Sequence, residues 1–173
     1  MRKLFILAAQ LICVMSLMAQ IPGDYDNRVL IPNGWWLSPV GEQIRLGDFP
    51  MNAALTDDEA YLAVLHGGQS KAQVMLFDVK EKKVTQAIQL KDAWQGIVFQ
   101  GTNLYVSGGF QNCVYTFRLE QGTLVAGDTI KLVEGKPEYD GAAAGLDVRQ
   151  NTLAIVFRRD RTLRYYNLQT KQQ

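Results

Sequence analysis

The sequence predicts an all-β fold built from a repeated unit of about forty residues. Three segments align on their apolar runs, with Leu62 followed by Leu104 after 42 residues and by Leu153 after a further 49. Each copy contains short β-branched and aromatic runs separated by Gly, Asn and Asp turns, which is typical of antiparallel strands. No stretch keeps the helical period over three turns, so no helix is expected.

Each repeat is predicted to hold four strands, of which the fourth is the most polar. The strands expected in the first unit are 52–55, 61–65, 74–78 and 84–90, and those in the second are 95–99, 104–107, 114–117 and 124–132. The third unit has strands at 144–148, 153–157 and 163–167 and no fourth, and an insertion is expected around residues 134–138. Four strands in about 40 residues, apolar inside and polar at the outer edge, predict β-propeller blades of four antiparallel strands. A β-sandwich is the alternative, but a sandwich would not require the repeat.

The first twenty residues predict a secretory signal peptide. Arg2 and Lys3 precede an apolar run over residues 4–15, and the small residue Ala19 comes before a polar stretch. The run is too short for a convincing membrane span and is broken by Gln10, although an uncleaved anchor is the alternative. We therefore expect a secreted or periplasmic protein with no membrane span after cleavage.

The remaining chain is predicted to have two parts. Residues 21–48 form an N-terminal segment with a lone outer, closing strand at 42–46, and residues 49–173 form a partial propeller whose last blade lacks its outer strand. At about 40 residues a blade, the mature chain has about three to four blades, whereas propellers have four to eight. The sequence thus predicts an incomplete ring and a fragment of a longer protein.

Composition excludes several kinds of site. The chain has 18 cations and 17 acids, so no polyanion-binding surface and no nucleic-acid partner is expected. His66 is the one histidine, which excludes a multi-histidine metal centre. Removal of the leader takes away Cys13 and leaves Cys113 alone, so we expect a buried structural thiol and no internal disulfide. No cofactor is predicted.

Several segments resemble a known family. Residues 104–109, Leu-Tyr-Val-Ser-Gly-Gly, resemble the Tyr-Val-Thr-Asn core of the YVTN-type propeller repeat, and residues 76–79 with Val84 resemble its later strands. Residues 28–39 and 46–52 are similar to the opening of secreted bacterial proteins that join such a propeller to an alkaline-phosphatase-like phosphoesterase domain, and residues 145–148 fit a later blade of that family. The resemblance covers residues 25–170 and implies a propeller module.

The resemblance does not bring a hydrolase site with it. Phosphoesterases of that superfamily hold two metals with several Asp and His ligands around a Ser or Thr nucleophile, which one histidine does not furnish. The enzyme question stays open and leans towards no. Candidate ligand contacts lie in predicted loops on one face of the ring: His66, Gly67, Gly68, Gly108, Gly109, Arg158 and Arg159. A turn residue at His66 and a solvated hairpin at Arg158 and Arg159 are the alternatives.

The function predicted from the sequence is a non-catalytic binding or scaffold module. Its partner would be an unknown small ligand or a partner protein domain, contacted by loops on one face of the ring. Two enzymatic alternatives remain: the front end of a propeller-fused phosphoesterase, and a propeller lactonase or hydrolase.

Overall fold

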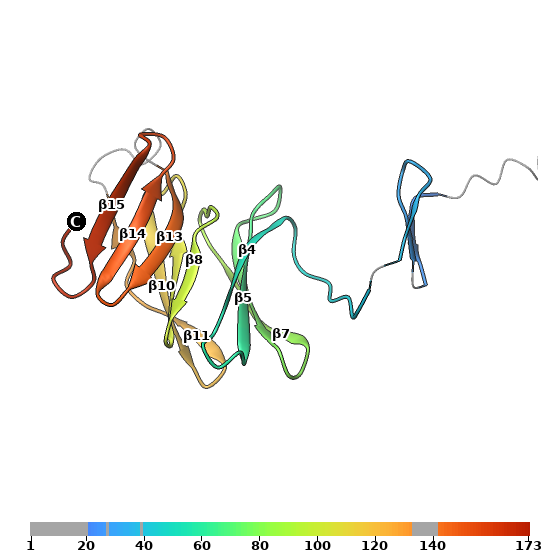
Figure 1. Cartoon of the computed structure of the whole chain (residues 1–173), viewed down its shortest axis with the longest axis horizontal. Helices are drawn as coiled ribbons and strands as arrows, with labels where there is room; N and C mark the ends of the chain where they lie inside the picture. Colours follow the sequence, from blue (N-terminus) through green and yellow to red (C-terminus); the bar gives the residue numbers. More distant parts are fainter. Residues whose placement is uncertain (1–20, 27, 39, 133–141) are drawn as a thin grey trace, which may run out of the picture. The chain divides into compact units, whose positions relative to one another are not determined.

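Every regular element that the structure describes is a β-strand (Figure 1). This computed structural model describes residues 21–26, 28–38, 40–132 and 142–173, so the predicted leader and the predicted insertion at 134–138 lie outside it. The chain divides into two units, Met1–Gln43 and Ile44–Gln173. Within the described residues, no helix is long and apolar enough to span a membrane.

The first unit holds a small antiparallel sheet that the sequence did not predict. Its strands are β1 (Gly23–Tyr25), β2 (Arg28–Leu30) and β3 (Trp36–Leu37). The Trp36 ring meets Tyr25 edge-on at 5.3 Å between centroids, and the Arg28 guanidinium lies 4.8 Å from the Trp36 ring centre. These contacts hold three very short strands together without a large core.

The lone outer strand predicted at 42–46 is not present in the structure. A strand is stable only when its backbone groups pair with a neighbour, and this segment pairs with no strand of the described residues. The prediction of an outer strand at 42–46 is therefore not confirmed.

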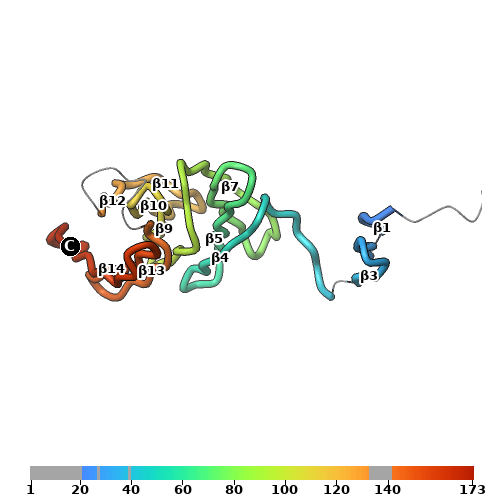
Figure 2. The backbone as a smooth tube through the Cα atoms, turned by 90° about the horizontal axis from the view of Figure 1, so that it is seen from above, coloured from blue at the N-terminus to red at the C-terminus, as the bar shows by residue number. Residues whose placement is uncertain are grey.

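The second unit contains three consecutive antiparallel sheets, here called blades 1, 2 and 3 (Figure 2). Blade 1 consists of β4 (Pro50–Leu55), β5 (Tyr61–His66), β6 (Gln73–Asp78) and β7 (Lys83–Gln89). Blade 2 consists of β8 (Ile97–Gln100), β9 (Asn103–Ser107), β10 (Cys113–Glu120), β11 (Thr123–Ala126) and β12 (Ile130–Lys131). Blade 3 consists of β13 (Ala143–Arg149), β14 (Thr152–Phe157) and β15 (Thr162–Asn167). Ten of the eleven strands predicted for the three units are present as single strands, the one predicted at 124–132 is divided in two, and the described sheets form no closed ring.

The outer strand of blade 2 differs from its prediction because it is interrupted. Residues 124–132 were expected as one strand, but β11 and β12 pair separately with β10. Between them the Thr116 hydroxyl donates to the carbonyl of Asp128 at 2.6 Å, and the amide of Gly127 donates to the carbonyl of Thr116 at 2.8 Å. These two bonds hold the interval between β11 and β12 against β10.

The core lies between the blades and follows the two-residue alternation of the strands. Leu104 and Val106 of β9 face blade 1, where they pack against Leu65 and Leu76. The residue between them, Tyr105, faces blade 3 and belongs to the second cluster, which contains Val114, Leu153, Ile155 and Phe157. Blade 2 is therefore packed on both faces.

Cys113 lies in this core, as the sequence predicts. Its side chain is buried and free of any disulfide among the described residues, and burial raises the pKa of the thiol. A neutral, buried thiol packs as a small apolar group and is a poor nucleophile.

Candidate functional site

Two of the glycines expected in ligand-contacting loops, Gly68 and Gly109, lie where a carboxylate approaches the backbone. After β5, Asp48 accepts hydrogen bonds from two loop amides, and after β9, Asp92 accepts one from the amide of Phe110. A Cβ at Gly68 would lie 2.8 Å from the Asp48 carboxylate, and a Cβ at Gly109 would lie 2.7 Å from that of Asp92. Both glycines also have positive φ, so the repeat uses them to admit the carboxylate.

The two preceding glycines are also placed by packing. A Cβ at Gly67 would lie 2.9 Å from the side chain of Met51, and one at Gly108 would lie 2.4 Å from the Cys113 sulfur. The role of these four glycines in the loops is thus accounted for by close contacts within the chain.

The two arginines of the candidate set rest on aromatic rings of blade 2 loops. The Arg158 guanidinium lies 4.8 Å from the centre of the Trp94 ring, and that of Arg159 lies 5.8 Å from the centre of the Phe110 ring. The amide of Ala143 donates to the carbonyl of Gly109 at 3.1 Å. The candidate residues of blades 2 and 3, namely Gly108, Gly109, Arg158 and Arg159, therefore lie close together. Those of blade 1, His66, Gly67 and Gly68, lie at the end of β5.

His66 is not the loop residue that the sequence predicts. It is the last residue of β5 and fully buried, because the segment preceding β4 covers it: a Cβ at Gly47 would lie 3.1 Å from its Nδ1. Neither ring nitrogen has a hydrogen-bond partner among the described residues. Burial lowers the pKa of His66, while the Asp48 and Gly47 carbonyls and the Asp48 carboxylate act in the opposite direction.

The buried His66 is expected to make stability fall in mild acid. Below the ordinary pKa of 6.5 the unfolded chain takes up a proton that the folded chain does not. The free energy of unfolding should then fall by up to about 1.4 kcal/mol per pH unit, until the lowered folded pKa is reached. His66→Leu, which replaces an unpaired polar ring by an apolar side chain of similar size, should remove this slope between pH 6.5 and 5 and be neutral or stabilising at pH 7.5. Denaturant unfolding across this range measures both, and equal slopes in the two proteins would contradict the assignment.

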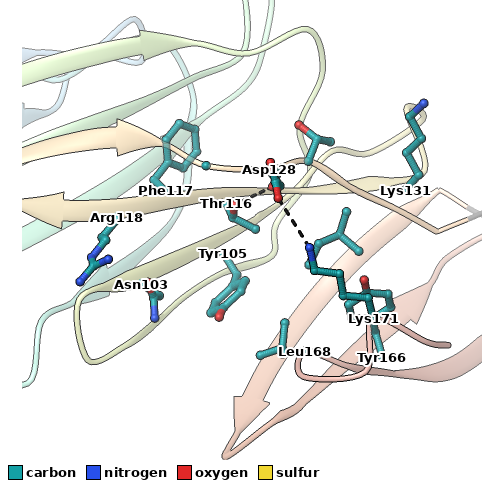
Figure 3. A pocket seen from close by; sticks show the side chains of 13 residues that line it. Asn103, Tyr105, Thr116, Phe117, Arg118, Asp128, Lys131, Tyr166, Leu168 and Lys171 are labelled. Carbon is teal, nitrogen blue, oxygen red and sulfur yellow. Dashed lines mark hydrogen bonds and ion pairs between the residues drawn. The ribbon is translucent and has the colours of Figure 1, made fainter.

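A groove of about 670 Å³ lies between the outer parts of blades 2 and 3 (Figure 3). Blade 2 contributes Tyr105 and the β10 side chains Thr116 and Arg118, and Figure 3 shows Tyr166, Leu168 and Lys171 on the opposite side. The full lining is Asn103, Tyr105, Thr116, Phe117, Arg118, Gly127, Asp128, Thr129, Ile130, Lys131, Tyr166, Leu168 and Lys171. The interruption between β11 and β12 forms part of its wall.

The groove has a mixed polar and apolar lining and carries both signs of charge. Lys171 Nζ lies 3.8 Å from an Asp128 carboxylate oxygen, and because both side chains are exposed the ion pair adds little to stability. Arg118 and Lys131 are further cations on the blade 2 side, and burial raises the pKa of Tyr105. Among the described residues, no three His, Cys, Asp or Glu side chains are close enough to share a metal ion. The lining is suited to binding, and we find no nucleophile with an adjacent base in it.

The groove runs beside the outer edge of blade 3, which differs from those of blades 1 and 2. Blade 3 has three strands, and in the described part of the chain β15 pairs with β14 on one side. On its other side it makes one bridge, in which the Asn167 amide donates to the carbonyl of Gln172 at 2.7 Å. The edge of β15 therefore offers unused backbone groups to a further strand.

The turn after β15 has the geometry of a turn that leads into a fourth strand. Asn167 Oδ1 accepts two amide bonds within the turn, and Lys171 has φ of 57°. In blade 1, Asp78 likewise accepts a bond within the turn, and Lys82 has φ of 52° before the chain enters β7. In both turns the first residue pairs with the residue five positions later: Asp78 with Lys83, and Asn167 with Gln172. The Asn167 turn therefore directs the chain along the edge of β15.

The outward face of blade 3 is apolar and uncovered in the described chain. In blades 1 and 2 the corresponding face packs on the next blade, and its members Val74 and Val114 are fully buried. On blade 3 the equivalent Leu163 is 54% exposed, Tyr165 is 58% exposed and Val156 is 47% exposed. The groove, the β15 edge and this face together are the candidate binding site.

Sequence reasoning missed the groove because its residues come from strands far apart in the chain. One local signal was present: the Asp78 and Asn167 turns share an Asx residue at the first position and a lysine four residues later. That pattern marks a turn into an outer strand, and in blade 3 it marks the edge that is open.

Comparisons with known proteins support the fold. No model of a protein family matches the chain, and no curated protein sequence does. Among solved structures, hydrazine synthase of Kuenenia stuttgartiensis is similar, with a TM-score of 0.59 and 20% identity over 71% of this chain and 35% of that one. A protein from Lactobacillus plantarum has a TM-score of 0.54 and 13% identity over 79% of this chain and 45% of that one.

These neighbours are propeller-type proteins, and the likeness shows that the three blades have the propeller fold. At such low identity it shows the fold alone. The chain spans about a third of the length of the hydrazine synthase chain and somewhat under half of that of the Lactobacillus plantarum protein.

Proposed function

We propose that the chain is a non-catalytic, secreted or periplasmic propeller module that binds an extended strand of a partner polypeptide at the outer edge of blade 3. The observation that carries the proposal is the outer edge of β15, which makes one bridge among the described residues and lies beside a groove of about 670 Å³. Addition of a strand to a sheet edge uses backbone hydrogen bonds for affinity and side-chain pockets for specificity. The groove and the exposed Leu163 and Tyr165 provide such pockets on the two sides of the edge.

The secreted or periplasmic location is supported by the leader-like residues 1–20, and the non-catalytic role by the content of the groove. The groove is lined by Tyr, Thr, Asn, Lys and Arg side chains, by the apolar Phe117, Ile130 and Leu168, and by one carboxylate, that of Asp128. Two-metal hydrolysis needs several carboxylate and histidine ligands, and general acid–base catalysis needs a group with a matched pKa. The groove lining is better suited to hold a polar peptide backbone than to hydrolyse an ester.

The proposal is tested by adding a fourth strand in cis. A chain extended after Gln173 by the sequence of residues 85–90, Thr-Gln-Ala-Ile-Gln-Leu, should continue from the Asn167 turn as β7 continues from the Asp78 turn. A strand worth about 2 kcal/mol should raise the melting temperature by about 4–8 °C. Hydrogen exchange at the β15 amides should slow in parallel, since those amides become paired.

A matched extension with proline in place of Gln86 and Ile88 is the control, because proline removes the donors and does not fit a paired strand. If the two extensions give the same melting temperature and the same β15 exchange, the edge is not a strand-binding site. The enzymatic alternative is checked on the same protein: metal-dependent hydrolysis of a phosphodiester or a lactone, in proportion to protein concentration, would refute the non-catalytic role.

A further inference from the structure

A second hollow lies between the outer parts of blades 1 and 2. It has a volume of about 200 Å³, and residues on both sides of the break between β11 and β12 line it. Both blades that form its walls have their outer strands in the structure, and β7 and β11 lie side by side there (Figure 2). The hollow therefore involves neither the edge of β15 nor the outward face of blade 3.

The inner wall of this hollow is apolar. Ile88 and Leu90 line it from blade 1 and Phe117 lines it from blade 2, and all three pack in the core between these blades. Ala126 follows two residues after the buried Leu124, so both side chains point to the same face, toward blade 1. At about 200 Å³ the hollow is smaller than the about 300–1,000 Å³ of small-molecule sites, and its size suits one anchoring side chain.

A side-chain amide beside the hollow already pairs with the edge of β11 as a peptide group would. Gln86 Nε2 donates to the carbonyl of Leu124 at 3.1 Å, and Gln86 Oε1 accepts the Leu124 amide at 2.7 Å. Backbone groups two residues apart in a strand point to the same side, so those of Ala126 also point away from β10. In the described chain neither the amide nor the carbonyl of Ala126 is paired, so the next position along this edge is available to a peptide.

The rim of the hollow carries a positive charge. Lys91 lines it two residues after the end of β7, is exposed, and forms no ion pair with another described residue. The acids next to this rim are engaged elsewhere: Asp92 accepts two backbone amides, and Asp128 pairs with Lys171. The Lys91 ammonium is therefore placed to meet a carboxylate of a bound molecule.

We propose that this hollow binds a polypeptide in which an apolar side chain stands next to a carboxylate. The apolar side chain fills the hollow, the peptide group of the same residue pairs with Ala126, and the carboxylate meets Lys91. A C-terminal leucine and an internal leucine followed by aspartate both present this chemistry. The inference goes beyond the proposed function, because the site uses the edge of β11 and no residue of blade 3.

The first test measures fluorescence anisotropy of labelled peptides with the full chain. The probes are Gly-Ser-Gly-Ser-Ala-Leu with a free carboxylate and Gly-Ser-Gly-Ser-Leu-Asp with a C-terminal amide, and at least one should bind saturably with a Kd below about 1 mM. The first peptide should bind about two- to fivefold more weakly as its C-terminal amide, because an exposed ion pair contributes this much. No saturable binding of either acidic probe, or equal binding when serine replaces leucine, would overturn the proposal.

A second test fills the hollow from within. Ala126→Leu should abolish binding of the peptides with an unchanged circular dichroism spectrum, because the larger side chain takes the place of the anchor. Val125→Leu, which enlarges the adjacent side chain on the opposite face of β11, should bind as the wild type does. A peptide with N-methyl-leucine checks the pairing without changing the protein, and it should bind about fivefold more weakly. Full binding by Ala126→Leu, or of the methylated peptide, would contradict the assigned site.

A third test concerns the charge at the rim. Lys91→Gln should remove the difference in affinity between the carboxylate and the amide forms of the first peptide, while the affinity for the amide form stays the same. Lys80→Gln, which removes an exposed lysine in the turn before β7, should keep the difference. If the preference for the carboxylate survives Lys91→Gln, the carboxylate is not bound at Lys91 and the proposal fails.

Discussion

Replacing Gly96 by alanine is expected to lower the free energy of unfolding by about 3 kcal/mol, as for an overpacked core position. A Cβ at this position would lie 2.3 Å from the carbonyl oxygen of Ala144 and 2.7 Å from Leu146 Cγ. The first of these is a backbone atom of β13, so the clash is relieved only if blade 3 moves away from blade 2. Gly96 also donates its amide to Ser107 Oγ at 3.0 Å, which fixes the start of β8 against β9.

The matched control for Gly96→Ala is Gly145→Ala in the adjacent blade. The nearest atom to a Cβ at Gly145 is Val156 Cγ2 at 3.6 Å, an ordinary contact, and the residue needs no positive φ. We expect Gly145→Ala to change stability by less than about 0.5 kcal/mol. Urea unfolding of the wild type and the two variants measures the difference, and similar midpoints for the two variants would show that blade 3 does not pack closely on Gly96.

Phe157→Ala is expected to be at least as damaging, with a loss of about 3–5 kcal/mol in the free energy of unfolding. Phe157 is fully buried between blades 2 and 3, and the Arg164 guanidinium lies 4.2 Å from the centre of its ring. Truncation leaves a cavity in the cluster that positions blade 3 against blade 2. Hydrogen exchange at β14 and β15 should therefore rise more than at β5 and β6.

Phe110→Ala makes the same chemical change at an exposed position and serves as the control. Phe110 is 40% exposed and supports Arg159, so its loss should cost only about 1 kcal/mol. Chemical unfolding gives both values. Equal costs for Phe157→Ala and Phe110→Ala would mean that the cluster between blades 2 and 3 does not hold the third blade.

The blades could be predicted from the sequence because their strands follow a local rule. Alternation over two residues in segments such as 61–66 and 152–157 sets both the strand and the buried face. The break between β11 and β12 could not be predicted, since it depends on the Thr116 hydroxyl of another strand. In the same way, the two glycines after His66 predict a loop, but the segment that buries His66 comes from around Gly47.

The candidate site was less accessible to sequence reasoning than the fold. The loop residues chosen for it proved to be held by contacts within the chain, as the approach of Asp48 to Gly68 and of Asp92 to Gly109 shows. The groove instead joins Tyr105, Lys131 and Tyr166, which only the packing of blade 3 on blade 2 brings together. The alternating pattern of residues 42–46 also predicted an outer strand, but no strand forms there, because an alternating pattern does not supply the neighbouring strand that pairing needs.

The packing of blade 2 on both faces has a consequence for the order in which the molecule opens. In a linear array of repeats, the stability of each unit depends on its own contacts and on those with its neighbours. Blade 3, with a neighbour on one face and three strands, should open first, and blade 2 should be the last to lose its protection. The strand that offers its edge to a partner thus belongs to the least cooperative part of the unit, where an added strand has the largest ordering effect.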